Sequence, residues 1–298
     1  MPFRVAAAQY PIDRFRAFAD YEIKITHWVT DAASKGARLI VFPEYGAMEL
    51  ASVAGPDIAS DLKRSIEAMQ DFLPAVHDLH KNLATQHQVY ICAASAPLRQ
   101  TDGTFRNTAR LFAPSGKVGA QEKRVMTRFE REEWAISSGE GLNVFDTSLG
   151  KIGIAICYDA EFPLLVRALV EAGAEMILVP SCTDDMPGYH RVRIACAARA
   201  LENQCFVVQS PTVGAADWSP AVDANAGAAN VFGPPDRSFP DDGVIATGAL
   251  NQPGFVFADI DLWRVKDVRR DGQVLNHLHW KEQPGAGELP EVTQVNLV

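Results

Sequence analysis

Short continuous apolar runs alternate with stretches of helical periodicity through the first third of the chain. In the stretches between these runs, apolar residues recur every three or four positions, which places them on one face of a helix. We therefore expect buried strands and amphipathic helices in turn, the order typical of a layered α/β domain. The expected strands are residues 3–9, 38–42 and 89–94, and the expected helices are residues 18–36 and 62–79.

A further apolar run from Lys151 to Ile156 ends at Cys157, which polar and turn-forming residues follow at once. Pro163 suits the first position of a helix, and apolar residues then recur at helical spacing up to Gly173. A thiol between this strand and this helix would face the positive amide end of the helix, which favours a thiolate and an oxyanion beside it. From this stretch alone, a buried structural cysteine is an equally good interpretation.

The rest of the chain predicts hairpins, two further strands and a helix rich in small residues. The hairpins are 105–112 with 117–120, 142–147 with 151–156, and 244–250 with 254–261; the strands are 176–180 and 205–209, and the helix is 192–203. Residues 214–243 are crowded with Gly, Ala, Pro, Asp and Asn, so they form either an active-site loop or a mobile insertion. We assign residues 1–262 to a single domain and residues 263–298 to a C-terminal extension, which either contacts a neighbouring subunit or frays.

Composition and charge exclude several classes of function. The chain has 298 residues, of which 47% are hydrophobic and 22% charged, as in a soluble globular protein with a full core. A formal net charge of -9 argues against nucleic acid and anionic membranes as partners, because attraction to phosphate would be absent. No apolar run reaches membrane-spanning length and the N-terminus has no targeting signal, so we expect a cytoplasmic protein.

The cysteines and histidines form neither a disulfide framework nor a metal-binding pattern. Five cysteines, an odd number without a Cys-x-x-Cys pair, indicate reduced thiols. We expect Cys92, Cys196 and Cys205 to fill core space as small apolar groups. His277 and His279 have no third ligand nearby, so surface or packing roles are expected rather than a metal site.

Three residues able to carry chemistry stand at the ends of predicted strands or hairpins. Glu44 follows an apolar run, Lys123 follows the first hairpin, and Cys157 stands between strand and helix. Taken alone, Glu44 is more often a surface carboxylate and Lys123 a solvated loop charge. In this order and local context, the three resemble the Glu, Lys and Cys of the nitrilase superfamily of carbon-nitrogen hydrolases. The resemblance covers most of the chain, and its supporting stretches are residues 7–9, 105–109, 161–163 and 198–203.

The resemblance implies an α/β fold, a four-layer α-β-β-α sandwich, that commonly assembles into homodimers or higher homo-oligomers. It also implies roles that cleavage of an unactivated amide requires: a nucleophile, a base and positive charge beside the oxyanion. Cys157 would attack the carbonyl, Glu44 would take the thiol proton, and Lys123 and the backbone N–H of Tyr158 would stabilise the intermediate. Because a carboxylate is usually too weak a base for a thiol, the site must be desolvated enough to raise the pKa of Glu44. No metal or organic cofactor is required.

Many members of the superfamily carry a second glutamate seven residues before a glycine, between the lysine and the cysteine. Glu132 precedes Gly139 by seven residues, so we choose it over Glu130 and Glu133 as the residue that holds the lysine and helps to position substrate or water. Cys182, which follows a predicted strand, is expected to line the pocket wall.

The expected function is hydrolysis of a small linear amide through a thioester, with release of ammonia and a carboxylic acid. The pair Tyr158-Asp159, in place of Trp-Glu, resembles the amidase-type branches more than true nitrilases. Hydrolysis of an N-carbamoyl compound or a nitrile, and acyl transfer from the same thioester, are the alternatives. A non-catalytic thiol sensor would keep Cys157 without needing Glu44 or Lys123.

Overall fold

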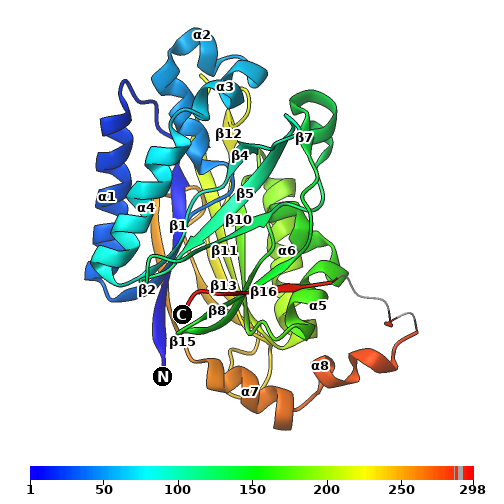
Figure 1. The fold of residues 1–298 in the computed structure, drawn as a ribbon. Coiled ribbons are helices and arrows are strands. Elements are labelled where there is room, and N and C mark those ends of the chain that lie inside the picture. Colours follow the sequence, from blue (N-terminus) through cyan, green and yellow to red (C-terminus); the bar gives the residue numbers. More distant parts are fainter. Residues whose placement is uncertain (285, 288–290) are drawn as a thin grey trace.

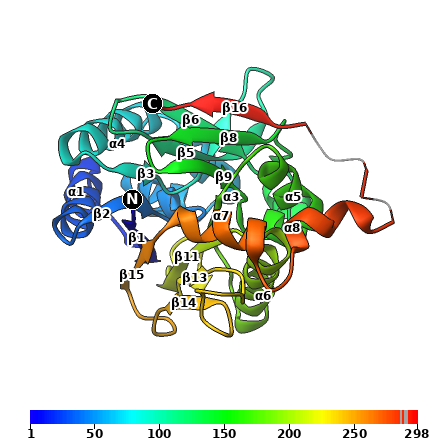
Figure 2. The same ribbon diagram turned by 90° about the horizontal axis from the view of Figure 1, so that it is seen from below.

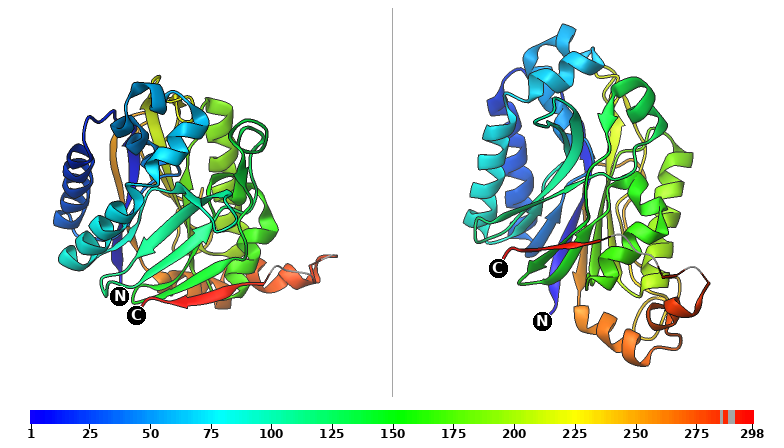
Figure 3. Two further views of the ribbon diagram at one scale, coloured as in Figure 1. Left: turned by 45° about the horizontal axis from the view of Figure 1, so that its top comes forward. Right: turned by 45° about the vertical axis from the view of Figure 1, so that its right-hand side comes forward.

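The computed structural model describes residues 1–284, 286–287 and 291–298, which fold into four layers (Figure 1). Two β-sheets pack face to face, and helices cover the outer face of each sheet, as the right-hand view of Figure 3 shows. The predicted α-β-β-α sandwich is therefore confirmed. The helices are α1 (Phe18–Ser34), α2 (Pro56–Ala59), α3 (Leu62–Met69) and α4 (Leu73–His87) on one side, α5 (Pro163–Glu171) and α6 (Met186–Asn203) on the other, and α7 (Leu262–Asp271) and α8 (Asn276–His279) near the end of the chain.

The strands pair into two sheets that are joined through one strand of each sheet. The strands of the first sheet are β1 (Phe3–Pro11), β2 (Ala37–Val41), β3 (Tyr90–Cys92), β4 (Ala96–Arg99), β5 (Phe105–Phe112), β6 (Val118–Glu122), β7 (Ile136–Ser137) and β15 (Gly254–Ile260). The remaining strands are β8 (Asn143–Thr147), β9 (Gly150–Ile154), β10 (Met176–Ser181), β11 (Phe206–Ala215), β12 (Ala224–Asn225), β13 (Asn230–Phe232), β14 (Val244–Thr247) and β16 (Thr293–Asn296). β1 pairs in parallel with β2, and β11 pairs in parallel with β10. The two sheets join where the end of β1 pairs with β11, Tyr10 opposite Thr212.

The sequence of β1 is a nearly continuous apolar run because both faces of this strand are buried. Val5 and Ala7 of β1 belong to a core shared with the second sheet, whereas Ala6 and Ala8 belong to a core shared with α1 and α4. All four side chains are fully buried. A strand covered on both faces has few positions for polar residues, which explains why the sequence predicts this strand correctly.

The predicted hairpin of residues 244–250 with residues 254–261 is wrong. β14 pairs with β13 in the second sheet, whereas β15 pairs with β1 in the first, Phe3 opposite Ile260. Both segments carry a strand-like pattern, but the choice of partner depends on packing between residues that are distant in the chain.

Two helix predictions also need correction. The single helix expected at residues 62–79 is two helices, because α3 ends at Met69 and α4 begins at Leu73. The helix expected at residues 192–203 begins earlier, at Met186, where the side chain of Asp185 caps it by accepting a hydrogen bond from the Gly188 N–H.

The predicted extension folds back onto the domain. The Arg167 guanidinium of α5 donates a hydrogen bond of 2.9 Å to the carbonyl oxygen of His277 in α8. Farther on, β16 pairs in parallel with β8 and forms an edge of the second sheet (Figure 2). Residues 285 and 288–290 of the extension lie outside the described residues. The boundary after residue 262 and a role at a subunit interface stay predictions.

Candidate active site

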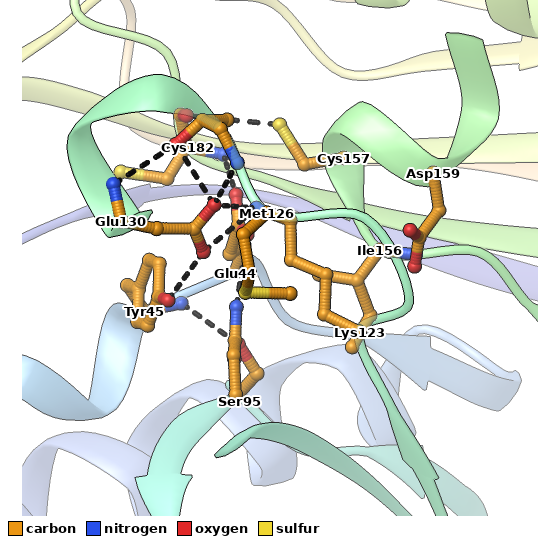
Figure 4. Close-up of polar contacts among 12 residues, drawn as sticks. Glu44, Tyr45, Ser95, Lys123, Met126, Glu130, Ile156, Cys157, Asp159 and Cys182 are labelled. Atoms are coloured by element: carbon orange, nitrogen blue, oxygen red, sulfur yellow. Dashed lines mark hydrogen bonds and ion pairs between the residues drawn. The ribbon is translucent and has the colours of Figure 1, made fainter. Parts of the chain in front are cut away.

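Strand ends bring Glu44, Lys123 and Cys157 into one buried cluster (Figure 4). Glu44 follows β2, Lys123 is the residue after β6, and Cys157 begins a short 3-10 turn after β9. Their exposed fractions are 1%, 1% and 4%. The structure therefore brings together the three residues that the sequence singled out from separate contexts.

The Lys123 ammonium lies between two carboxylates. Its Nζ atom is 2.7 Å from Oε1 of Glu44, and 2.9 and 2.8 Å from the two carboxylate oxygens of Glu130. Burial by itself would lower the pKa of Lys123, but the charges of Glu130 and Glu44 outweigh burial and raise this pKa well above its ordinary value. The site therefore contains a lysine that keeps its positive charge at any physiological pH.

Glu44 is held by two further donors. The side-chain amide of Asn107 donates to Oε1 at 2.9 Å, and the backbone N–H of Cys182 donates to Oε2 at 3.1 Å. Burial raises the pKa of Glu44 to about 7, while Lys123 opposes the rise and Glu130 adds to it. A carboxylate with this pKa is a far better proton acceptor than an exposed glutamate, as the sequence analysis required.

Cys157 lies at a sharp bend of the backbone. Its φ angle of 48° is in the left-handed region, and its Sγ atom lies 3.7 Å from the carbonyl oxygen of Cys182. Burial raises the pKa of Cys157 well above its ordinary value; Glu44 raises it further and Lys123 lowers it. The resting group is therefore a thiol, and it needs a neighbouring base to become a nucleophile.

The structure corrects the choice of the second glutamate. Glu132 points away from the site, with a side chain 55% exposed that pairs with Arg128 at 2.8 Å. The carboxylate that contacts Lys123 belongs to Glu130. Residues 130–134 form a turn of π-helix, in which local spacing does not show which of three acidic residues points inward.

Glu130 is 2% exposed and has polar partners on several sides. The Tyr45 hydroxyl donates to it at 2.6 Å, and the backbone N–H of Thr127 donates at 2.7 Å. Burial by itself would raise the pKa of Glu130, but Lys123 and these hydrogen bonds hold it below the ordinary value. Glu130 is therefore a fixed negative charge, whereas Glu44 can exchange a proton near neutral pH.

Cys182 contributes to the cluster through its backbone. Its N–H binds Glu44, its carbonyl oxygen accepts from Cys157, and its own Sγ lies 3.4 Å from the side-chain oxygen of Asn225. Cys182 and Tyr158 both line the cavity. The role of the Tyr158 backbone N–H as an oxyanion donor stays a prediction.

A cavity of about 490 Å³ opens over the thiol. This volume suits a small-molecule substrate. The aromatic part of the lining is Tyr45, Phe129, Trp134 and Tyr158. Besides Glu44, Lys123 and Glu130, its charged part is Arg128, Glu161, Asp184, Asp185 and Arg191.

The other cysteines and the paired histidines lie elsewhere. Cys92, Cys196 and Cys205 are fully buried in the core, as predicted. Among the residues that the structure describes, no group of three or more His, Cys, Asp or Glu side chains is arranged to hold a metal ion. Within the same part of the chain, no helix combines the length and apolar character needed to cross a bilayer.

A family model described as carbon-nitrogen hydrolase matches residues 4–270. The chain belongs to the carbon-nitrogen hydrolase family. One solved structure that it resembles, Nit3 of Saccharomyces cerevisiae, is described as a member of the nitrilase superfamily; the TM-score is 0.71 at 19% identity, over 90% of this chain and 93% of that one. The family model therefore confirms the resemblance to carbon-nitrogen hydrolases, and at 19% identity the solved structure shows that the fold is shared.

Curated relatives of this carbon-nitrogen hydrolase include named amidases. The probable hydrolase YhcX of Bacillus subtilis (strain 168) is 34% identical over 276 residues, which are 92% of this chain and 52% of the relative. This chain thus spans about half the length of that protein. Omega-amidase NIT2-B of Xenopus laevis is 25% identical over 90% of this chain and 91% of the relative.

A further solved structure shows the same fold with a modified cysteine. A mutant amidase from Nesterenkonia sp. AN1, in which acrylamide has added to the active site cysteine, has a TM-score of 0.66 to this chain. It is 21% identical over 94% of this chain and all of that one. At this identity the likeness establishes the fold alone.

Proposed function

We propose that this carbon-nitrogen hydrolase is an amidase that cleaves a small linear amide and releases ammonia and a carboxylic acid. The observation that carries the proposal is the cluster in which Lys123 bridges Glu44 and Glu130 beside the Cys157 thiol. A nucleophile, a base with a raised pKa and a fixed cation thus meet at one cavity. Relatives named omega-amidase and a similar structure of an amidase support the same reaction class.

In the acylation step, the Sγ atom of Cys157 forms a bond to the amide carbon while Glu44 takes the thiol proton. The carbonyl oxygen becomes an oxyanion, which the positive charge of Lys123 stabilises. Collapse of this intermediate breaks the C–N bond, and Glu44 gives its proton to the leaving nitrogen, so that ammonia departs. The product is a thioester on Cys157.

In the deacylation step, a water molecule attacks the thioester carbon while Glu44 takes a proton from the water. The second tetrahedral intermediate expels the thiolate, which regains the proton from Glu44 as the carboxylic acid leaves. Glu130 and its bonds to Tyr45 and Thr127 keep Lys123 in place through both steps. Of the two glutamates, only Glu44 changes protonation, because its pKa lies near neutrality and that of Glu130 lies below the ordinary value.

The decisive experiment measures ammonia released from a panel of short-chain amides, ω-amides of dicarboxylic acids, N-carbamoyl compounds and nitriles. We expect turnover of a linear amide, and a loss of at least ~10³-fold in kcat/KM for Cys157→Ala. Equal turnover by the parent protein and Cys157→Ala would overturn the proposal.

The same panel separates the alternatives. Turnover confined to N-carbamoyl compounds or nitriles would replace the amide with that substrate class. If added amines capture the acyl group at the expense of free acid, the thioester serves acyl transfer. An inert panel combined with a reactive Cys157 would favour acyl transfer or an amide outside the panel.

We also propose that the enzyme acts as a homodimer or higher homo-oligomer in the cytoplasm. Apolar side chains exposed on α5 and α6 support association: Leu164, Ile194 and Leu201 are 45%, 64% and 44% exposed. The five free thiols suit a reducing compartment. Light scattering of the purified protein tests the assembly, and a mass of 32.5 kDa, that of one chain, would contradict it.

A further inference from the structure

One buried carboxylate joins the two segments that carry the lysine and the cysteine. Asp159 lies in the turn that begins at Cys157 and is 2% exposed. Its carboxylate accepts hydrogen bonds from the backbone N–H of Arg124 at 3.1 Å, of Val125 at 2.8 Å and of Ile156 at 3.3 Å. Figure 4 shows this side chain beside Ile156, at the edge of the catalytic cluster.

The donors lie next to Lys123 and Cys157 in the sequence. Arg124 and Val125 are the two residues that follow Lys123, and Ile156 directly precedes Cys157. The carboxylate therefore bridges a loop after β6 and a turn after β9, which are connected only distantly along the chain. We propose that Asp159 is a positioning residue that sets the distance between the Lys123 ammonium and the Cys157 thiol. This inference rests on the proposed function, because it assigns Asp159 to the same reaction.

The chemistry of the contact requires a carboxylate. Every hydrogen bond that Asp159 accepts within the described residues comes from an N–H group, so both of its oxygens must be acceptors. An asparagine has one acceptor and one donor on the same frame. With its NH₂ group at the Oδ2 position, the asparagine would lose the hydrogen bond from Ile156; with that group at the Oδ1 position, it would lose the bond from Val125 and keep only one from Arg124.

Burial of a carboxylate costs free energy. The hydrogen bonds of Asp159 must therefore contribute more to the structure than those of an exposed carboxylate would. Burial raises the pKa of Asp159 to about 6, while Lys123 and the three backbone amides oppose the rise. The ion that remains at neutral pH is thus stabilised by the groups that it holds together. A simple turn-capping role would need Ile156 alone and not the two amides beyond Lys123.

The test uses Asp159→Asn in the full chain, with Asp71→Asn as a matched control at an exposed aspartate. We expect kcat to fall at least ~30-fold with KM within about threefold, because the reacting groups and not the cavity wall are displaced. Asp71→Asn should behave as the parent. A kcat for Asp159→Asn within about threefold of the parent would overturn the proposal.

A second readout does not depend on turnover. The rate of Cys157 alkylation by iodoacetamide reports the thiolate, which Lys123 favours through its charge. We expect Asp159→Asn and Lys123→Met each to slow alkylation about tenfold, and the double variant to be no slower than Lys123→Met alone. If the fold-decrease in alkylation rate of the double variant equals the product of the two single decreases, Asp159 does not act through the lysine, and the proposal is overturned.

Two controls keep the outcomes distinct. If Asp159→Asn does not fold, the same cycle with Asp159→Glu decides, since this variant keeps both acceptors but moves them by one methylene. Independent decreases in alkylation rate in that cycle, whose product equals the decrease in the double variant, again overturn the inference. Failure of the proposed function would appear in a different measurement. Cys157→Ala would then still hydrolyse amides, whatever the alkylation rates of the Asp159 variants.

Discussion

Two lysines, the buried Lys123 and the half-buried Lys24, each contact carboxylates in this molecule, yet only one of the two clusters is placed to do chemistry. The Nζ atom of Lys24 lies 2.8 Å from a carboxylate oxygen of Glu49 and 2.8 Å from one of Asp13. Its other acceptor is the carbonyl oxygen of Pro11, at 2.6 Å. This cluster fastens the end of β1 to the segment that follows Glu44, and so it serves the fold.

Perturbed pKa values occur in both clusters. Burial raises the pKa of Glu49, as it does that of Glu44, and Lys24 opposes the rise as Lys123 does. The difference lies in the surroundings of the charged groups. The Lys123 cluster lies beside a thiol and lines the cavity, whereas Lys24 and Glu49 are not among the residues that line this cavity. A shifted pKa therefore indicates only that a charged group is buried. A candidate active site needs, in addition, a nucleophile that faces a cavity.

The sharpest way to test this comparison is to remove each lysine in turn. We expect Lys123→Met to lower kcat/KM by at least ~10³-fold, because the oxyanion loses its cation. Lys24→Met should instead lower the free energy of unfolding by about 3 kcal/mol, since Glu49 is left buried without its ion pair. Its kcat/KM should stay within about threefold of the parent.

Steady-state kinetics and urea unfolding of both variants measure these effects. The assay must run where each variant is fully folded. A large catalytic loss in Lys24→Met at unchanged KM would show that the two clusters are coupled, and the distinction drawn between them would then be wrong.

The next effect concerns pH. Because burial raises the pKa of Glu44 to about 7, and the base must be deprotonated to accept the thiol proton, activity should fall on the acid side of neutrality. We expect kcat/KM to drop about tenfold per pH unit below about 7. A profile from pH 5 to 9 checks this, and an acid limb at the ordinary pKa of a glutamate would contradict a buried base.

The smallest effects distinguish the adjacent glutamates. Glu130→Gln removes one charged hydrogen-bond partner of Lys123 and should lower kcat about tenfold, equivalent to ~1.4 kcal/mol. Glu132→Gln and Glu133→Gln, which change exposed side chains, should leave kcat within about twofold. If Glu132→Gln were the more damaging change, the contact seen between Lys123 and Glu130 would not be the one that matters in catalysis.

The sequence singles out Glu44, Lys123 and Cys157 because each follows a predicted strand or hairpin, in the order of the family that the chain resembles. The structure brings the three side chains together, and their catalytic roles stay a proposal. Glu130 and Asp159 were missed for a different reason. Whether Glu130 or Glu132 points inward depends on a π-helical turn that no periodicity reveals. The partners of Asp159 lie 35 and 34 residues earlier in the chain, so its buried state is a product of tertiary structure.

The same limit applies to the fold. β1 and β2 are recognisable because burial on both faces leaves a continuous apolar run. β14 and β15 are recognisable as strands, but their partners are not, because pairing with β13 or with β1 is decided by the packing of whole layers. In this chain, local sequence largely determines whether a segment is a helix or a strand. It does not determine which strands pair or which polar side chains point inward.

The left-handed backbone at Cys157 has an evolutionary consequence. A residue with a Cβ atom costs about 1–2 kcal/mol in this conformation, and glycine does not bear that cost. Selection for stability alone would therefore favour glycine at this bend. Under the proposed function, the cysteine at this bend is kept for its reactivity at a cost in the free energy of folding.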